Sequence, residues 1–263
     1  MTSTPEPSAA QAESIRGVVL LPTYNERENL EAIVAAILAA QPALDVLVID
    51  DASPDGTGAL ADALAAAEAR VQVLHRGGKE GLGRAYLDGF ARALASSANY
   101  SHLIQMDADF SHDPAHLAAM LAAARAGADV VVGSRYVAGG RTVGWSRRRR
   151  LLSRAGGTYA RLVLGVGVRD LTAGFVCYRR GVLEALDLAG VEASGYGFQI
   201  EMKYRSARAG FTVREVPIAF PDRQRGTSKM SLGIMVEALG LVWRLRWRDR
   251  ASAADPGARG ARA

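Results

Sequence analysis

Two hydrophobic patterns alternate along this chain. Short continuous apolar runs predict strands that are buried on both faces, and apolar residues spaced three or four positions apart predict amphipathic helices. The predicted strands cover residues 17–21, 45–49, 71–75, 103–106 and 129–133, a short segment after Phe175, and residues 212–220 with a break at Pro217. The predicted helices cover residues 27–40, a segment that reaches about Ala67, residues 85–94, 114–125 and 151–164, a segment from Gly195, and residues 231–247. This alternation predicts an α/β fold, with a mostly parallel sheet and helices on both faces.

The chain of 263 residues is long enough for one domain with a full core. Residues 1–16 are rich in Pro, Ser, Ala and Glu and lack periodicity, so we expect a disordered tail there. Residues 17–230 form the single predicted domain, and residues 231–248 form an amphipathic helix that faces a membrane. Residues 249–263 are expected to be a second disordered tail.

The predicted C-terminal helix is too short to span a bilayer, which needs about 20 apolar residues. Trp243 and Trp247 lie four residues apart among several arginines, a pattern that suits the interface of a membrane. The alternative is a helix that packs on the sheet and leaves its basic end in solvent. Both interpretations stay open at this stage.

Positive charge is concentrated in the middle of the chain. The formal net charge is +5, and no acidic residue occurs between Asp129 and Asp170. That interval contains Arg135, Arg141, Arg147, Arg148, Arg149, Arg150, Arg154, Arg161 and Arg169. Such a segment predicts anionic partners such as phosphates or lipid headgroups. Nucleic acid is not expected, because few aromatic residues interleave with the arginines and no nucleic-acid-binding motif occurs.

The cysteine content and the first residues of the chain indicate the cellular compartment in which the protein is expected. Cys177 is the only cysteine, which excludes an internal disulfide and a cysteine-based zinc cluster. Residues 1–16 have no basic start followed by an apolar core, so no secretory signal is expected. We expect a cytoplasmic protein, peripheral on the cytoplasmic face of the membrane.

Two acidic pairs follow predicted strands. Asp107 and Asp109 come after the strand at 103–106, and Asp50 with Asp51 ends the strand at 45–49. The carboxyl ends of strands are where open α/β sheets bind ligands, and alternate side chains of extended backbone point the same way. Asp107 and Asp109 can therefore direct oxygen ligands at one hard divalent cation. The alternative for this short motif alone is a solvated turn.

Two further segments are candidates for anion sites. The glycine-rich residues 77–83 lack the Ser or Thr that follows the lysine of a phosphate loop, and their glycine spacing does not match a dinucleotide-binding motif. Residues 223–229 are compact and cationic, with small neighbours that let a phosphate reach the backbone amides. Anion binding is favoured for this second segment over an exposed loop.

Five short motifs occur in an order and spacing that resemble the polyprenol phosphate mannosyltransferases, which are GT-A glycosyltransferases of the dolichol-phosphate-mannose synthase type. The motifs are residues 22–26 (PTYNE), 50–56 (DDASPDG), 107–109 (DAD), 133–136 (GSRY) and 225–229 (RGTSK). The resemblance extends from about Gly17 to Trp247. It implies a Rossmann-like GT-A fold and an inverting transfer of mannose from GDP-mannose to the phosphate of a polyprenyl phosphate.

The resemblance also implies site residues. Those for the nucleotide sugar are Pro22, Tyr24, Glu26, Ile49, Asp51, Asp107, Ala108, Asp109, Arg225 and Lys229. The resemblance implies that Asp107 and Asp109 bind the metal, Mg²⁺ or Mn²⁺. Ser111 stands at the position where many relatives have a Gln as a further metal ligand. It implies that Arg135, Arg149 and Ser153 bind the lipid phosphate. The implied catalytic residues are Asp109, Arg135, Arg149 and Arg225. A membrane-anchoring protein partner is a further expectation.

The chemistry is consistent with these residues. A monophosphate ester has its second pKa near about 6, so it is a nucleophile at neutral pH and requires no protein base. The nearest alternative is a polyprenyl-phosphate glucosyltransferase that uses UDP-glucose. A second enzyme alternative is a transferase that acts on a neutral hydroxyl, which would need a carboxylate base. The alternative from another class of protein is a non-catalytic sugar-nucleotide-binding module.

Overall fold

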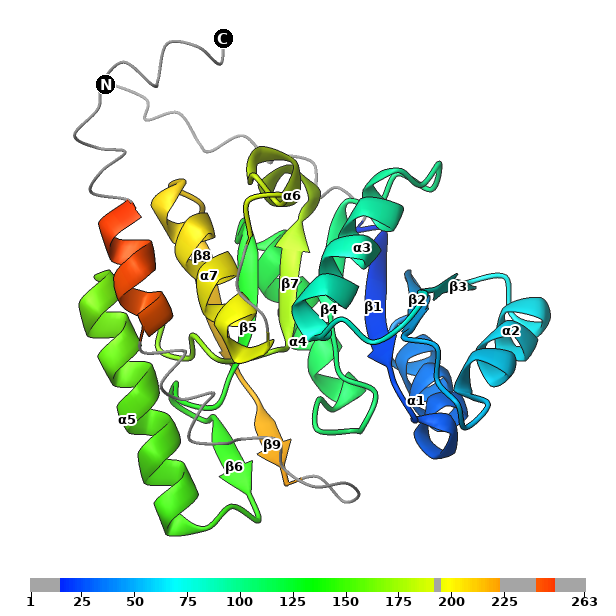
Figure 1. Ribbon diagram of the computed structural model, residues 1–263, viewed down its shortest axis with the longest axis horizontal. Coiled ribbons are helices and arrows are strands. Elements are labelled where there is room, and N and C mark those ends of the chain that lie inside the picture. The colour runs from blue at the N-terminus through cyan, green and yellow to red at the C-terminus, as the bar shows by residue number, and fades with distance from the viewer. Residues whose placement is uncertain (1–14, 192–194, 223–239, 249–263) are drawn as a thin grey trace, which may run out of the picture.

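The computed structural model describes residues 15–191, 195–222 and 240–248. Its centre is a seven-stranded sheet in the order β3-β2-β1-β4-β7-β5-β8 (Figure 1). The strands are β1 (Gly17–Thr23), β2 (Leu44–Asp50), β3 (Val71–His75), β4 (His102–Gln105), β5 (Val130–Ser134), β7 (Val176–Arg179) and β8 (Val213–Pro217).

The prediction of a mostly parallel sheet is confirmed. The pairs β1–β2, β1–β4, β2–β3 and β5–β8 are parallel, whereas β7 is antiparallel to both β4 and β5. The amino end of β7 therefore lies at the same edge of the sheet as the carboxyl ends of β1, β2, β4 and β5. The order also reverses between β1 and β4, which is the kind of position where open α/β sheets bind ligands.

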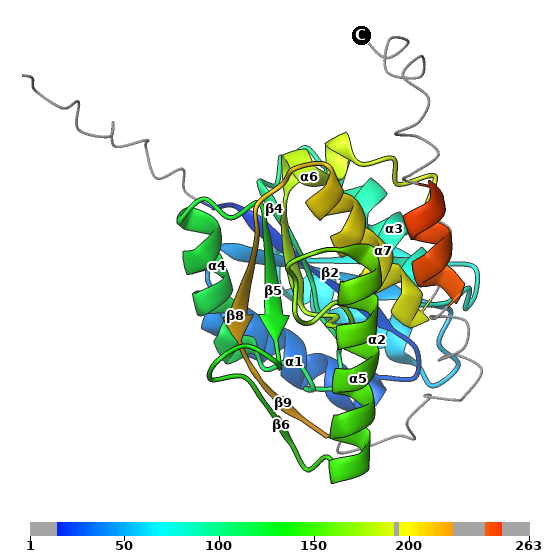
Figure 2. The same ribbon diagram turned by 90° about the vertical axis from the view of Figure 1, so that its left-hand side faces the viewer.

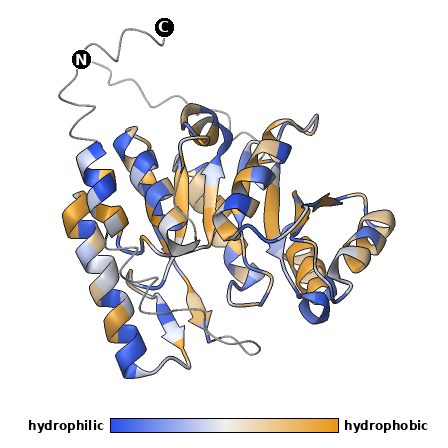
Figure 3. Cartoon of the chain, in the orientation of Figure 1, coloured by the Kyte–Doolittle hydropathy of each residue, from blue (hydrophilic) through white to orange (hydrophobic). Residues whose placement is uncertain are grey.

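Helices cover both faces of the sheet (Figures 1 and 2). Apolar residues of α1, α2 and α4 pack on one face, and those of α3, α6 and α7 on the other. The helices are α1 (Arg27–Ala40), α2 (Thr57–Ala67), α3 (Leu82–Leu94), the 3₁₀ turn η1 (Pro114–His116), α4 (Leu117–Arg125), α5 (Arg147–Leu164), α6 (Arg180–Ala185) and α7 (Gly195–Arg208). Figure 3 shows the central strands as a hydrophobic layer between them.

A small two-stranded ribbon lies beyond the carboxyl edge of the sheet. It consists of β6 (Arg141–Val143) and β9 (Ala219–Pro221), which pair in parallel (Figure 1). The predicted strand at 212–220 is interrupted directly after Pro217, at Ile218, so that β8 stays in the main sheet while β9 joins β6. The sequence did not predict β6 or α6, because both are too short to produce a clear period.

The C-terminal helix at 240–248 lies beside α5 (Figures 1 and 2). Leu241, Val242 and Leu245 form a third apolar cluster with residues of α5 and α7. Trp243 Nε1 donates to Tyr159 Oη at 2.8 Å. The helix thus packs on α5 and α7 and still exposes Trp243 and Trp247, and its position in a membrane interface stays a prediction. None of the described helices is long and apolar enough to cross a membrane.

The predicted boundaries of the tails lie mostly outside the described residues. Ile15 is an exception, because it is buried in the core two residues before the expected start of the domain. In the helix predicted for 231–248, only residues 240–248 are described, and they are helical.

Candidate active site

The carboxyl ends of β1, β2 and β4 each continue into a tight loop. One residue in each loop adopts a left-handed backbone conformation: Asn25 (φ 60°), Ala52 (φ 54°) and Phe110 (φ 60°). Such conformations are costly for residues with a side chain, and they cluster at functional sites where the surroundings enforce them. All three loops carry residues that the sequence assigned to substrate or metal.

The loops after β1 and β2 are joined by hydrogen bonds. Pro22 and Ile49 are register partners, and the Asp51 N–H donates to the Thr23 carbonyl at 3.1 Å. The Glu26 N–H donates to Thr57 Oγ1 at 3.0 Å. These contacts bring the residues predicted for the nucleoside to one place on the sheet edge.

Asp51 is buried and paired with Arg76, a residue that the sequence analysis missed. Arg76 also binds Asp88 through Nε at 2.8 Å and Glu80 through Nη2 at 3.0 Å, so three carboxylates hold its guanidinium. Burial raises the pKa of Asp51, and the Arg76 guanidinium acts against that shift. Nearby, Lys79 Nζ lies 3.8 Å from the centre of the Tyr24 ring. The glycine-rich segment therefore reaches the residues predicted for the nucleoside.

The acidic pair after β4 is held by its own loop. The Ser111 N–H donates to Asp109 Oδ1 at 3.0 Å. The Asp107 N–H donates to His112 Nδ1 at 2.9 Å, and the His112 ring stacks on Phe175 with 5.0 Å between ring centres. His112 is buried and was not predicted. Its position just after the acidic motif was the available signal.

The residues of this loop fit a divalent metal. Ser111 Oγ is buried and has no hydrogen-bond partner among the described residues, so a metal or a metal-bound water would satisfy it. In the described part of the chain, His, Cys, Asp and Glu form no cluster of three or more that could hold a metal. Mg²⁺ commonly binds through one or two carboxylates together with substrate phosphates, which matches the pair Asp107 and Asp109.

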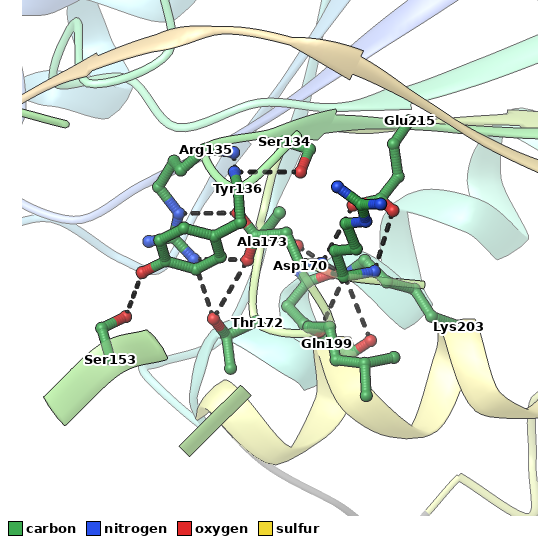
Figure 4. A network of polar contacts seen from close by, with 12 residues as sticks. Ser134, Arg135, Tyr136, Ser153, Asp170, Thr172, Ala173, Gln199, Lys203 and Glu215 are labelled. Atoms are coloured by element: carbon green, nitrogen blue, oxygen red, sulfur yellow. Dashed lines mark hydrogen bonds and ion pairs between the residues drawn. The ribbon is translucent and has the colours of Figure 1, made fainter. Parts of the chain in front are cut away.

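Arg135 follows β5 and forms a buried ion pair with Asp170 (Figure 4). Its Nε donates to Asp170 Oδ2 at 2.8 Å and its Nη2 to Asp170 Oδ1 at 2.6 Å. The backbone N–H of Arg135 also donates to Asp170 Oδ2, at 2.9 Å. Burial alone would raise the pKa of Asp170, but Arg135 outweighs it and holds that pKa below its ordinary value. Arg135 is thus fixed by a bidentate contact that the sequence analysis did not foresee.

Two further predicted phosphate ligands, Arg149 and Ser153, lie in the first two turns of α5. Ser153 Oγ accepts from Tyr136 Oη at 2.6 Å. Arg149 donates through Nη1 to Asp222 at 2.6 Å, and its guanidinium lies 3.9 Å from the centre of the Trp145 ring. Arg149 and Ser153 are therefore held by tertiary contacts at the ribbon side of the site. Arg225 and Lys229 lie outside the described residues.

The comparisons with known proteins identify the family. Residues 18–187 match the model of glycosyl transferase family 2. The chain is 52% identical over 240 residues to a polyprenol monophosphomannose synthase of Mycolicibacterium smegmatis, which covers 90% of each chain. It is 48% identical over 230 residues to an undecaprenyl-phosphate mannosyltransferase of Micrococcus luteus, covering 88% of this chain and 93% of that one.

Solved structures agree at the level of the fold. Glucosyl-3-phosphoglycerate synthase from Mycobacterium tuberculosis, in complex with Mn²⁺, UDP-glucose and phosphoglyceric acid, superposes with a TM-score of 0.67 at 20% identity. The match covers 93% of this chain and 86% of that one. The family model and the two relatives show that the chain is a glycosyltransferase and belongs to glycosyl transferase family 2.

Proposed function

We propose that this enzyme transfers mannose from GDP-mannose to the phosphate of a polyprenyl phosphate, with inversion at the anomeric carbon. One observation carries the proposal. About half of the aligned residues are identical between this chain and each of two mannosyltransferases whose names specify a polyprenol or its phosphate. That similarity extends along about nine-tenths of the chain, so it includes both the acidic loop and the arginine-rich segment.

The order of the strands suggests how the substrates lie. The nucleoside would lie at the ends of β1 and β2, against Tyr24 and Asp51. The diphosphate would lie at the end of β4, where Asp107 and Asp109, with Ser111, would hold Mg²⁺ or Mn²⁺. The sugar would then reach the start of β7, and the acceptor phosphate would lie between β5 and α5.

For this reaction the protein must bring together two anions, the nucleotide sugar and the polyprenyl phosphate. A bound divalent cation would stabilise the charge that develops on the departing GDP. Arg149, Ser153, Arg225 and Lys229 would neutralise and orient phosphate groups, with Arg135 anchored beside them on Asp170. The acceptor phosphate is the nucleophile, so a single displacement at the anomeric carbon inverts its configuration. Fixing both substrates in line can lower the barrier by about 7 to 11 kcal/mol.

Because the proposed acceptor is a lipid, the enzyme would act at a membrane surface. Leu151 and Leu162 are exposed on α5 and Trp247 is exposed on the C-terminal helix, and Leu151 directly follows the arginines at the start of α5. We infer a peripheral position on the cytoplasmic face of the membrane, by insertion of these apolar side chains and attraction of the arginines to anionic headgroups. A membrane-anchoring protein partner would act at the same surface.

Transfer of radiolabelled sugar to a detergent-dispersed polyprenyl phosphate tests the proposal. Label from GDP-mannose should enter the lipid with Mg²⁺ or Mn²⁺ and not with EDTA. Label from UDP-glucose alone would instead make the protein a polyprenyl-phosphate glucosyltransferase. Absence of transfer from either donor, with nucleotide still bound, would favour a non-catalytic sugar-nucleotide-binding module.

A further inference from the structure

Gln199 has a buried hydrogen-bond donor, the side-chain amide N–H, that has no role in the proposed binding of metal, nucleotide or acceptor. It lies in the second turn of α7, and its side chain is nearly enclosed, with 3% of the residue exposed. Its Oε1 accepts from Lys203 Nζ at 3.4 Å, so the amide oxygen is the atom that faces Lys203. Its Nε2 has no hydrogen-bond partner in the described part of the chain. A buried N–H without a partner is costly, so a ligand that accepts from it gains that free energy.

Lys203 holds this amide in a rigid frame (Figure 4). The side chain of Lys203 is fully buried, and its Nζ donates to the carbonyls of Leu171 at 3.1 Å and Ala173 at 2.6 Å. It also donates to the Gln199 carbonyl at 3.2 Å. The Lys203 amino group therefore ties α7 to the segment that leads into β7. The Gln199 side chain is positioned by that contact rather than by solvent.

The unused N–H lies beside the metal loop. A Cβ placed on Gly174 would be 3.9 Å from Gln199 Nε2 and 3.2 Å from His112 Cε1. His112 in turn accepts the N–H of Asp107. Gln199, Gly174 and His112 thus meet next to the carboxylate pair, on the side of the sheet edge that leads towards Arg135. Glycine at position 174 keeps this space free of a side chain.

We propose that Gln199 binds the transferred hexose, with Nε2 donating a hydrogen bond to one of its hydroxyl oxygens. This inference rests on the proposed function, which puts the diphosphate at β4 and the acceptor phosphate between β5 and α5. The start of β7 lies between those two places in the strand order, so the sugar passes Gly174 and Gln199. A neutral amide donor suits a neutral hydroxyl, and Lys203 is the residue that positions it.

The variant Gln199→Glu tests the proposal, because it keeps the shape and the acceptor for Lys203 but removes the donor. The dissociation constants of GDP and GDP-mannose are measured by calorimetry with Mn²⁺ for the full chain. GDP lacks the sugar, so its affinity should stay within about twofold of wild type. The affinity for GDP-mannose should fall about tenfold, as expected for one lost hydrogen bond.

The control is Gln72→Glu on β3, where the wild-type amide donates to Tyr100 Oη at 2.8 Å, away from the site. It should bind both ligands as wild type does. Equal loss of GDP and GDP-mannose affinity in Gln199→Glu, or no loss of either, would overturn the assignment. Wild type that binds GDP-mannose but transfers no mannose would refute only the proposed acceptor, and the ratio of affinities would still decide the role of Gln199. Wild type that does not bind GDP-mannose would overturn both.

Discussion

Arg135 and Asp170 are separated by 35 positions in the sequence and form a buried, bidentate ion pair beside the acceptor side of the site. A buried charge without a counterion is strongly unfavourable. The pair therefore explains why an arginine can be held rigidly in a segment that otherwise collects only positive charge. Asp170 is also the residue at which the acid-free interval ends, a signal present in the sequence whose meaning depended on the fold.

Asp170→Asn should destabilise the protein by about 3 to 5 kcal/mol, because Arg135 stays buried while its counterion is removed. The free energy of unfolding in urea measures this change. Asp222→Asn is the matched control, since it breaks the partly exposed pair with Arg149 and should cost at most about 1 kcal/mol. Equal losses in the two variants would mean that the buried pair has no special role.

Lys203 predicts a pH dependence of stability. Burial lowers the pKa of Lys203 to about 7, while Asp170 acts in the opposite direction. Between pH 7 and the ordinary value of 10.5 the unfolded chain holds this proton and the folded chain does not. The stability of wild type minus that of Lys203→Met should therefore rise with pH across this window and level off below it. Urea unfolding of both proteins along a pH series measures the difference, and a constant value would show that Lys203 stays protonated throughout.

At the scale of elements, the loop between β5 and β6 is packed against the backbone that carries Arg135. A Cβ on Gly140 would lie 2.5 Å from the Ser134 carbonyl oxygen and 2.9 Å from the Arg135 carbonyl carbon. Backbone atoms cannot move aside as a flexible side chain does. Glycine at 140 is thus required for the close approach of the ribbon to the sheet.

Gly140→Ala should lower the free energy of unfolding by about 1 to 3 kcal/mol and reduce turnover, because the inserted methyl displaces the backbone at Arg135. Gly77→Ala makes the same chemical change where nothing lies within 4 Å, and should stay within about 0.5 kcal/mol of wild type. Thermal or urea unfolding together with transfer rates tests both. Wild-type stability in Gly140→Ala would contradict the packing.

The long periodic elements were predictable and the short irregular ones were not. Helix α1 has the predicted bounds because its apolar residues repeat at the helical period and all pack on the sheet. The three-residue strands β6 and β9 owe their conformation to each other, which no local pattern reveals. The same holds for the site. The acidic motif after β4 could be found from its position, whereas the contacts of Arg76, His112, Gln199 and Lys203 depend on tertiary packing.

At the scale of the molecule, the apolar residues exposed on α5 and the C-terminal helix lie on one side of the domain (Figures 1 and 2). Leu162 is 71% exposed and Trp247 is 59% exposed. Figure 3 shows the lower end of α5 as hydrophilic, which is where Arg147, Arg148 and Arg150 lie. Exposed apolar side chains along this side of the domain, together with the arginines at the start of α5, form a surface suited to an anionic membrane.

Leu162→Glu and Trp247→Glu should each weaken binding to vesicles of anionic phospholipid by about tenfold, because each removes an apolar group and adds a repelled charge. Co-sedimentation measures the bound fraction. Leu82→Glu, which changes an exposed leucine at the start of α3, serves as the control and should bind as wild type does. Undiminished binding of both α5-side variants would contradict this membrane surface.

The most direct test of the central claim is the rate of mannosyl-lipid formation by Asp109→Asn, measured with saturating Mn²⁺, GDP-mannose and polyprenyl phosphate. Asp113→Asn is the comparison, because Asp113 caps η1 by accepting the Ala115 N–H in the same loop. We predict at least a hundredfold loss for Asp109→Asn and a rate within about threefold of wild type for Asp113→Asn. A wild-type rate for Asp109→Asn would contradict the assignment of the acidic pair at β4 as the centre of the reaction.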